Sequence, residues 1–159
     1  MPYERTAKEL MIPLEKCPTV RLEQTVKDAV ALLKNTAGSG YRNVLVLDET
    51  GQPAGFVSFH SVLEALQPEF LVTDKWTLPV FWRGFMEAKC KEEACKKVRE
   101  VMRPISFITI DAADPITKAV HLMTSHGIQT LPVIEDGKVI GILRSREIFD
   151  EVSNLIISQ

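Results

Sequence analysis

Hydrophobic residues recur along the chain in two similar series, set about 90 residues apart. The segment AKELMIP around Met11 returns as VREVMRP around Met102, and the step Thr19-Val20 returns as Thr109-Ile110. Self-similarity at a fixed spacing is typical of a duplicated structural unit. The chain is therefore predicted to contain two copies of one fold.

Each copy continues with a helical pattern and then two apolar runs joined by a turn. The helical stripes are Val26, Ala29, Val30 and Leu33 in the first copy and Ile116, Ala119, Val120 and Met123 in the second. This i, i+3, i+4, i+7 spacing predicts helices that each bury one face. The apolar runs are 44–47 and 54–59 in the first copy and 131–134 and 139–144 in the second, with turns ending at Gly51 and Gly137. Short apolar runs bounded by turn residues predict buried strands and hairpins.

A last amphipathic segment closes each copy, so the repeated unit is predicted to be β-α-β-β-α. A unit this small exposes too much apolar surface to be stable alone, and the two copies are expected to pack sheet against sheet about a pseudo-twofold axis. The predicted fold class is α/β. The predicted boundaries are 1–66 for the first repeat, 67–95 for a mostly helical insertion, and 96–159 for the second repeat.

The charge balance argues against a nucleic-acid partner. Nineteen Lys and Arg face 21 Asp and Glu, a net charge of -2, whereas nucleic-acid binders carry a basic excess. The start of the chain is charged and no apolar stretch reaches membrane-spanning length, so we expect a cytoplasmic protein without a membrane partner. Cys17, Cys90 and Cys95 form no CxxC pair and are predicted to be reduced thiols.

Catalytic signatures are missing from the sequence. His60, His121 and His126 are scattered at spacings that do not suit a shared metal ion, so no metal site is predicted. The chain contains no GxSxG, P-loop or HExxH motif. We therefore expect a protein that is not an enzyme.

The order of elements, and the motif that runs from the third strand of each copy into the helix after it, resemble the tandem cystathionine β-synthase (CBS) domain, or Bateman module. In that family the motif reads Gly, two apolar residues, Ser or Thr, two residues, Asp; here it reads GFVSFHS and GILRSRE. The resemblance covers about residues 5–66 and 96–157. It implies clefts that bind adenine nucleotides, in which the glycine admits the ligand, the hydroxyl and helix start receive phosphate, and the carboxylate accepts ribose hydroxyls.

The first copy departs from this pattern at its acid. Gly55 and Ser58 match, but Ser61 stands where the family has Asp, so the ribose acceptor is missing. The resemblance implies a weaker cleft formed by Ser58, Ser61, Ile108, Ile128, Gln129 and Thr130. Ser61 is alternatively a helix N-cap without any ligand role.

The second copy keeps a carboxylate and gains arginines. Gly141 matches, Arg144 replaces the hydroxyl residue, and Glu147 stands for Asp on a longer arm. The resemblance implies a main cleft formed by Gly141, Arg144, Ser145, Arg146, Glu147, Pro18, Thr19, Tyr41, Arg42 and Asn43. Arginines beside a helix start favour an anionic, phosphorylated ligand. Candidates are AMP, ADP, ATP or another adenosyl compound, and no cofactor is required.

Each of these residues also has a reading without a ligand. Ser145 suits a helix N-cap, and Glu147 favours the helix dipole. Arg144 and Arg146 suit paired surface charges, and Tyr41 suits packing between helix and sheet.

The insertion is rich in aromatic residues and holds five of the eleven in the chain, including both tryptophans. Trp76, Phe81, Trp82 and Phe85 are candidates for contact with a dimer partner or another protein, because aromatic residues anchor interfaces. They alternatively cover the protein's own apolar face. A charged helix is predicted from Met86 into the second repeat.

Two functions follow from these observations. The first is a regulatory module that senses an adenine nucleotide, forms a homodimer and acts on an unidentified protein. The alternative is a scaffold that only dimerises or docks through the aromatic insertion, with both clefts empty.

Overall fold

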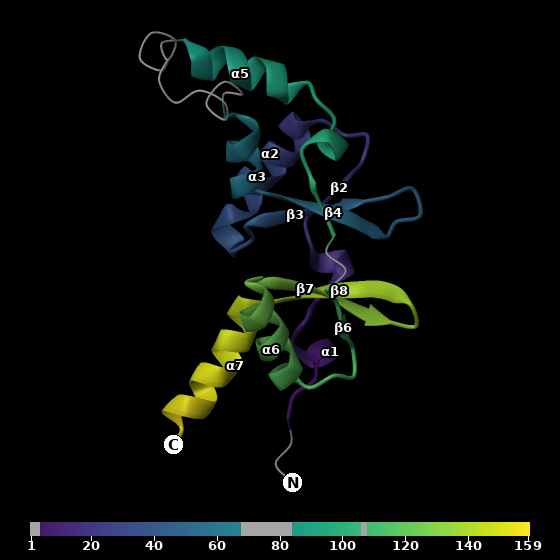
Figure 1. The fold of residues 1–159 in the computed structure, drawn as a ribbon, viewed down its shortest axis with the longest axis vertical. Coiled ribbons are helices and arrows are strands. Elements are labelled where there is room, and N and C mark those ends of the chain that lie inside the picture. Colours follow the sequence, from purple (N-terminus) through teal and green to yellow (C-terminus); the bar gives the residue numbers. More distant parts are fainter. Residues whose placement is uncertain (1–3, 68–83, 106–107) are drawn as a thin grey trace. The chain divides into compact units, whose positions relative to one another are not determined.

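The computed structural model describes residues 4–67, 84–105 and 108–159, which form two compact units (Figure 1). Unit 1 comprises Met1–Cys17 and Ser106–Gln159, and unit 2 comprises Pro18–Ile105. Each unit contains a four-stranded sheet with helices packed on it. The predicted α/β class with two related repeats is confirmed.

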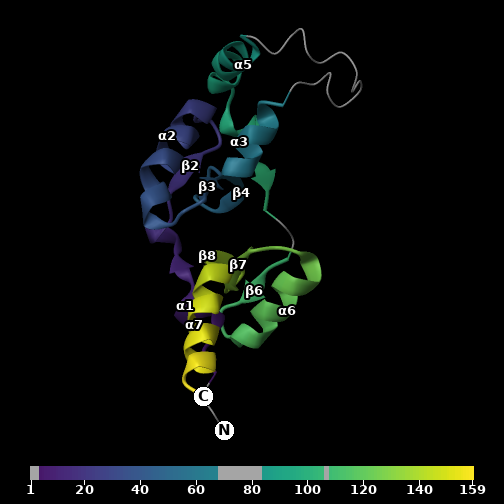
Figure 2. The same ribbon diagram turned by 90° about the vertical axis from the view of Figure 1, so that its left-hand side faces the viewer.

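Unit 2 is built on the sheet β2-β3-β4-β5 (Figure 2). Its elements are β2 (Thr19–Arg21), α2 (Val26–Thr36), η2 (Ala37–Ser39), β3 (Asn43–Leu47), β4 (Pro53–Ser58), α3 (Phe59–Ala65), α5 (Phe85–Ala94), η3 (Val98–Glu100) and β5 (Arg103–Pro104). Strands β2 and β3 are parallel, and β3 and β4 form an antiparallel hairpin. The core joins Val20, Ala29, Leu33, Val44, Val46, Val57 and Val98.

Local sequence explains the boundaries of these elements. Thr25 starts α2 with a capping box, in which its hydroxyl accepts from the amide of Asp28 at 3.3 Å. The β3–β4 turn is closed by the Asp48 carboxylate, which accepts from Thr50 and Gln52. Hydrogen bonds to the ionised form, the largest from the Thr50 hydroxyl, hold the pKa of Asp48 below its usual value.

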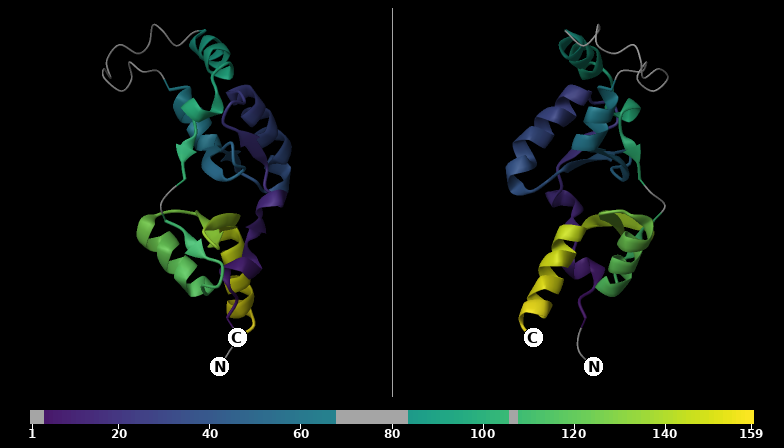
Figure 3. Two further views of the ribbon diagram at one scale, coloured as in Figure 1. Left: turned by 90° about the vertical axis from the view of Figure 1, so that its right-hand side faces the viewer. Right: turned by 60° about the vertical axis from the view of Figure 1, so that its left-hand side comes forward.

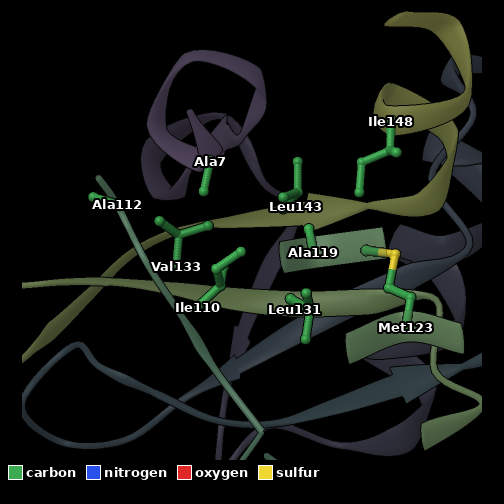
Figure 4. Packing of buried hydrophobic residues seen from close by; sticks show 9 residues of the cluster. All are labelled: Ala7, Ile110, Ala112, Ala119, Met123, Leu131, Val133, Leu143 and Ile148. Atoms are coloured by element: carbon green, nitrogen blue, oxygen red, sulfur yellow. The ribbon is translucent and has the colours of Figure 1, made fainter. Parts of the chain in front are cut away.

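Unit 1 is built on the sheet β1-β8-β7-β6. Its elements are α1 (Ala7–Leu10), β1 (Ile12–Pro13), η1 (Leu14–Lys16), β6 (Ile110–Asp111), α6 (Ile116–His126), β7 (Thr130–Glu135), β8 (Lys138–Arg144) and α7 (Ser145–Ile157). Figure 4 shows the core, in which Ala7, Ile110, Ala112, Ala119, Met123, Leu131, Val133, Leu143 and Ile148 meet. Helices α6 and α7 pack beside each other in this unit (Figure 3).

The predicted helical stripes are buried except at one equivalent position in each repeat. Val26, Ala29 and Leu33 are buried in α2, as are the corresponding residues of α6. Val30 and Val120, however, are each 38% exposed. The i+4 position of each stripe therefore lies at the edge of the apolar face rather than in the core.

The opening segment of each repeat packs on the sheet of the other repeat. Strand β1 pairs with β8, with Pro13 opposite Gly141, and β5 pairs with β4, with Pro104 opposite Gly55. The compact units therefore differ from the predicted ranges 1–66 and 96–159. The two copies have exchanged their AKELMIP and VREVMRP segments.

Helix α5 begins at Phe85 but ends at Ala94, so the prediction of one helix running into the second repeat is wrong. The chain turns there to bond the start of α2: the Lys96 carbonyl accepts from Val26 at 2.8 Å, and Val98 donates to Gln24 at 2.8 Å. These tertiary hydrogen bonds replace the helical ones.

The other aromatic residues proposed for partner contact, Trp76, Phe81 and Trp82, lie outside the described residues. Their role stays a prediction.

Candidate functional site

The start of α7 carries the main candidate site in unit 1. We call Gly141, Arg144, Ser145 and Glu147 the Glu147 half-site. Arg144 ends β8 and occupies the N-cap position of α7, and Glu147 lies in the first helical turn. The Arg144 Nε donates to both carboxylate oxygens of Glu147 at 3.0 Å, and Nη2 donates to Oε1. The two side chains are only 16% and 21% exposed, so the carboxylate and the guanidinium form a largely buried ion pair.

Cys17 lies near this ion pair within the same unit. Burial raises the pKa of the Cys17 thiol to about 11, while the Arg144 charge opposes the shift and the charges of Glu15 and Glu147 add to it. The thiol donates to the Pro13 carbonyl at 3.4 Å. A thiol held in this protonated form is a packing group rather than a nucleophile.

The weaker predicted site also has residues in unit 1, and they adjoin the Glu147 half-site. Ser145 donates its amide to the Gln129 carbonyl at 2.8 Å, and Thr130 pairs with Arg144 across β7 and β8. Ser145 is the first residue of α7 rather than its N-cap. The structure thus brings predicted residues of both clefts together where β7 begins and β8 ends, in the middle of the unit 1 sheet.

Arg146 lies in different surroundings. It lines an apolar groove of about 530 Å³ between α6 and α7, together with Val120, Met123, Thr124, Ser145, Ile148, Phe149 and Val152. The ion pair with Glu147 involves Arg144. The predicted contact between Arg146 and a ligand stays a prediction.

Unit 2 gathers further predicted residues at the corresponding end of its own strands, where β2 and β3 begin. We call Pro18, Thr19, Tyr41, Arg42 and Asn43 the Thr19 half-site. The Pro18 carbonyl accepts from Leu45 at 2.9 Å, which places Thr19 at the start of β2 beside β3. Asn43 pairs with Ser58 across β3 and β4. Tyr41 is partly buried and Arg42 is exposed just before β3.

Ser58 and Ser61 bond each other at the start of α3. The Ser58 amide donates to Ser61 Oγ at 2.6 Å, and the Ser61 amide donates to Ser58 Oγ at 3.1 Å. Ser58 is therefore the N-cap, and the reading of Ser61 as N-cap is wrong: it is the third helical residue of a capping box. Ser61 is 3% exposed, so its hydroxyl serves the helix start.

The motif glycines have a structural role that the sequence pattern alone did not show. A Cβ on Gly141 would lie 2.4 Å from the Ile12 carbonyl oxygen and 2.8 Å from Met11 Sδ. A Cβ on Gly55 would lie 2.4 Å from the Arg103 oxygen and 3.0 Å from Met102 Sδ. Each motif glycine is therefore required because the exchanged strand leaves no room for a Cβ. The contact of Gly141 with a ligand stays a prediction.

Two searches of the described ranges bear on other function classes. In residues 4–67, 84–105 and 108–159, no group of three or more His, Cys, Asp or Glu side chains is arranged to hold a metal ion. No helix in that same part of the chain has the length and hydropathy needed to span a bilayer.

Comparison with known proteins identifies the family. The model of the CBS domain matches residues 7–68 and again 98–154, together more than half of the chain. The chain belongs to the CBS domain family. The two matches confirm the predicted tandem CBS pair.

Solved CBS structures share its fold. A CBS domain-containing protein of unknown function from Kribbella flavida has a TM-score of 0.72 at 19% identity, with 93% of this chain and 98% of that chain covered. A Bacillus anthracis CBS domain-containing protein of unknown function has a TM-score of 0.70 at 22% identity, covering 94% of each chain. CBSX2, solved in complex with AMP, has a TM-score of 0.66 at 21% identity, covering 94% and 97%.

One curated relative is more similar in sequence over a shorter stretch. Inosine-5'-monophosphate dehydrogenase from Korarchaeum cryptofilum is 35% identical over 81 residues, which make up 46% of this chain and 17% of that enzyme. The chain thus spans less than a fifth of that relative's length.

Proposed function

We propose that this CBS pair is a regulatory module that binds an adenine nucleotide through the Glu147 half-site. The observation that carries the proposal is the buried pair of Arg144 and Glu147 at the start of α7. A carboxylate suits two ribose hydroxyls, and a guanidinium beside a helix start suits a phosphate. A CBS relative of the same fold was solved in complex with AMP, which supports this ligand class.

Pro18, Thr19, Tyr41, Arg42 and Asn43 stay proposed ligand contacts within unit 2. Thr19 and Asn43 begin the parallel neighbouring strands β2 and β3, so both lie at one end of the unit 2 sheet.

A ligand that binds one conformation of the module better than another shifts the population toward that conformation, by the difference in its affinity for the two. An unidentified partner protein that binds the same conformation better would respond to the nucleotide. This linkage makes the module a sensor without any catalytic step.

A thermal-shift screen with AMP, ADP, ATP, NAD and S-adenosylmethionine tests the proposal. Binding to the folded state alone adds about 2.7 kcal/mol of stability at a ligand concentration a hundred times Kd. We expect a rise in Tm with at least one nucleotide, and loss of most of that rise in Glu147→Ala. Ser61→Ala is the matched control at the equivalent position of the first repeat, and its rise should be unchanged. No rise with any ligand at millimolar concentration contradicts the proposal.

A second candidate function is homodimerisation, favoured by the exposed apolar face of unit 1. Phe149 is 69% exposed beside the α6–α7 groove, and the end of α7 exposes Leu155, Ile156 and Ile157. Exposed apolar patches of this kind mark interaction sites. In unit 2, the hollow on the equivalent helices α2 and α3 is also lined by Cys90 and Ala94 of α5.

Sedimentation of two matched variants tests the dimer. Phe149→Asp introduces a charge on the open face, and Leu63→Asp introduces one at the equivalent position of unit 2, where the side chain is 65% exposed. We expect the first variant to dissociate at concentrations at which the second remains dimeric. Dissociation of Trp82→Ala with an unaffected Phe149→Asp would instead favour the aromatic insertion as the interface. If the wild-type protein is a monomer at every concentration, neither the apolar face of α6 and α7 nor the aromatic insertion forms a dimer interface.

A further inference from the structure

One face of α7 combines exposed apolar residues with two side chains of opposite charge. Phe149, Ile156 and Ile157 are exposed on this helix. Arg146 and Asp150 lie one turn apart, with Phe149 between them in the sequence. Spacings of three, four and seven residues place all five side chains on one side of the helix. We call these five residues the α7 face.

The two charges of the α7 face are not used inside unit 1. Within the part of the chain that the structure describes, neither the Arg146 guanidinium nor the Asp150 carboxylate makes an ion pair or a hydrogen bond. They do not pair with each other, although their i, i+4 spacing allows it. The next carboxylate along the helix, that of Glu151, does pair with Arg5 at 3.3 Å. A cation and an anion beside an apolar surface are thus available to a partner.

The equivalent helix of unit 2 differs in this respect. Its residues at the positions of Arg146 and Asp150 are His60 and Glu64. Glu64 accepts a hydrogen bond from Arg103 of the same unit at 2.8 Å, and His60 Nε2 lies 3.9 Å from the same carboxylate. The hollow beside α3 is lined partly by α5, whereas the groove beside α7 is lined by α6 and α7 alone. Unit 2 therefore satisfies within itself the groups that unit 1 leaves open.

We propose that the α7 face binds the same face of a second copy, with the two α7 helices antiparallel and Arg146 of each copy paired with Asp150 of the other. This inference rests on the homodimer named above as the second candidate function. In a twofold interface every contact occurs twice, so a face that carries both halves of an ion pair complements itself. An antiparallel alignment about Phe149 brings opposite charges together twice, whereas a parallel alignment brings like charges together.

The apolar part of the face complements itself as well. Phe149 is exposed and lines the α6–α7 groove of about 530 Å³, whose walls include Val120, Met123 and Val152. Each copy therefore offers both an aromatic side chain and an apolar groove that can receive one. Aromatic residues in such grooves are typical anchors of an interface, and charges at the rim select the orientation of the partner.

Sedimentation equilibrium of the full chain tests the contact with charge reversals. Arg146→Asp leaves two acids on each face and Asp150→Arg leaves two arginines, so each variant alone should dimerise at least about tenfold more weakly than the wild type. An equimolar mixture of the two variants should recover wild-type affinity, because each arginine then meets an acid. The double variant Arg146→Asp/Asp150→Arg should dimerise alone. His60→Asp is the matched control in the first repeat and should leave the dissociation constant of the dimer unchanged.

Recovery on mixing distinguishes a contact between copies from damage to the fold, because a damaged fold is not repaired by mixing. If the single variants dimerise like the wild type, or if the mixture stays monomeric, the antiparallel contact is wrong. Homodimerisation survives that result provided that the wild type dimerises and Phe149→Asp dissociates. A wild type that is monomeric at every concentration overturns both. If Arg146→Asp instead weakens AMP binding and leaves the dimer unchanged, Arg146 is a ligand contact and the proposal is overturned.

Discussion

Replacement of Gly141 by alanine is expected to detach the opening segment of the chain from unit 1. The added Cβ would lie 2.4 Å from the Ile12 carbonyl oxygen, about 1 Å closer than an ordinary contact between carbon and oxygen. Strand β1 has only two residues and must move as a whole. Overpacking of this kind costs about 1–3 kcal/mol, and loss of the burial of Ala7 adds to the cost.

Hydrogen exchange followed by mass spectrometry measures this effect locally. Amides of residues 7–13 should exchange about 5- to 150-fold faster in Gly141→Ala, because 1–3 kcal/mol of local stability is lost. Amides of 98–104 should be unaffected. In Gly55→Ala, amides of 98–104 should exchange faster and those of 7–13 should be unaffected, because the added Cβ would lie at the same distance from the Arg103 oxygen.

Gly38→Ala is the control for these variants. A Cβ at Gly38 meets nothing within 4 Å, so the substitution should leave exchange unchanged or stabilise the protein by about 0.4–1 kcal/mol. Unchanged exchange of 7–13 in Gly141→Ala would refute the role assigned to this glycine in the strand exchange.

Three further predictions follow from the two units. At pH 8, thiol labelling should show Cys17 reacting about a hundredfold or more slowly than the exposed Cys90 and Cys95, since Cys17 is buried and burial raises the pKa of its thiol to about 11; three equal rates contradict this. Burial opposes ionisation of Glu93, but hydrogen bonds from Lys96 and Lys89 hold its pKa below the ordinary 4.5. The charged form of Glu93 therefore stabilises the fold above pH 4.5, and this stability is lost as the pH falls through the folded-state pKa. In urea unfolding, Glu93→Gln should lower the free energy of unfolding by about 1–2 kcal/mol at pH 7 and by less at pH 3.5. An equal loss at both pH values would contradict the stabilising role of the charged form. Residues 18–105 should fold as a separate chain by circular dichroism, whereas 106–159 should fold only when residues 1–17 are supplied, and independent folding of 106–159 would show that the exchange is dispensable.

The regular elements were predictable because local sequence determines them. The run 44–47 lies within β3 and 131–134 within β7, since each is apolar, short and bounded by turns. The strand exchange was not predictable from the repeat. Each copy carries a Met-x-Pro segment and a glycine that leaves room for a neighbouring strand, so either segment could pair with either sheet. Tertiary contacts decide which segment pairs with which sheet.

The sequence predicted which residues belong to the candidate site, but it did not predict the contacts that these residues make with one another. Arg144 and Glu147 were both assigned to a ligand, yet their i, i+3 spacing already favoured a contact with each other. Ser58 and Ser61 share that spacing, but a serine at the third helical position is not the usual Glu or Gln of a capping box. Arg146 was assigned to the same cleft as Arg144 by the family motif, although two residues along a helix turn a side chain by about 200°.

The exchange of opening segments also sets an order of assembly during synthesis. Unit 2 is one continuous stretch and is complete once Ile105 is made, whereas β1 waits for β8 for on the order of ten seconds of translation. During that time the nascent Met11–Pro13 segment meets the open edge of β4, where Gly55 offers the same slot as Gly141. Strand β5 must pair with β4 before the Met11–Pro13 segment does. The two copies of the opening segment thus compete kinetically for β4, and the fold requires that the copy synthesised later pairs there.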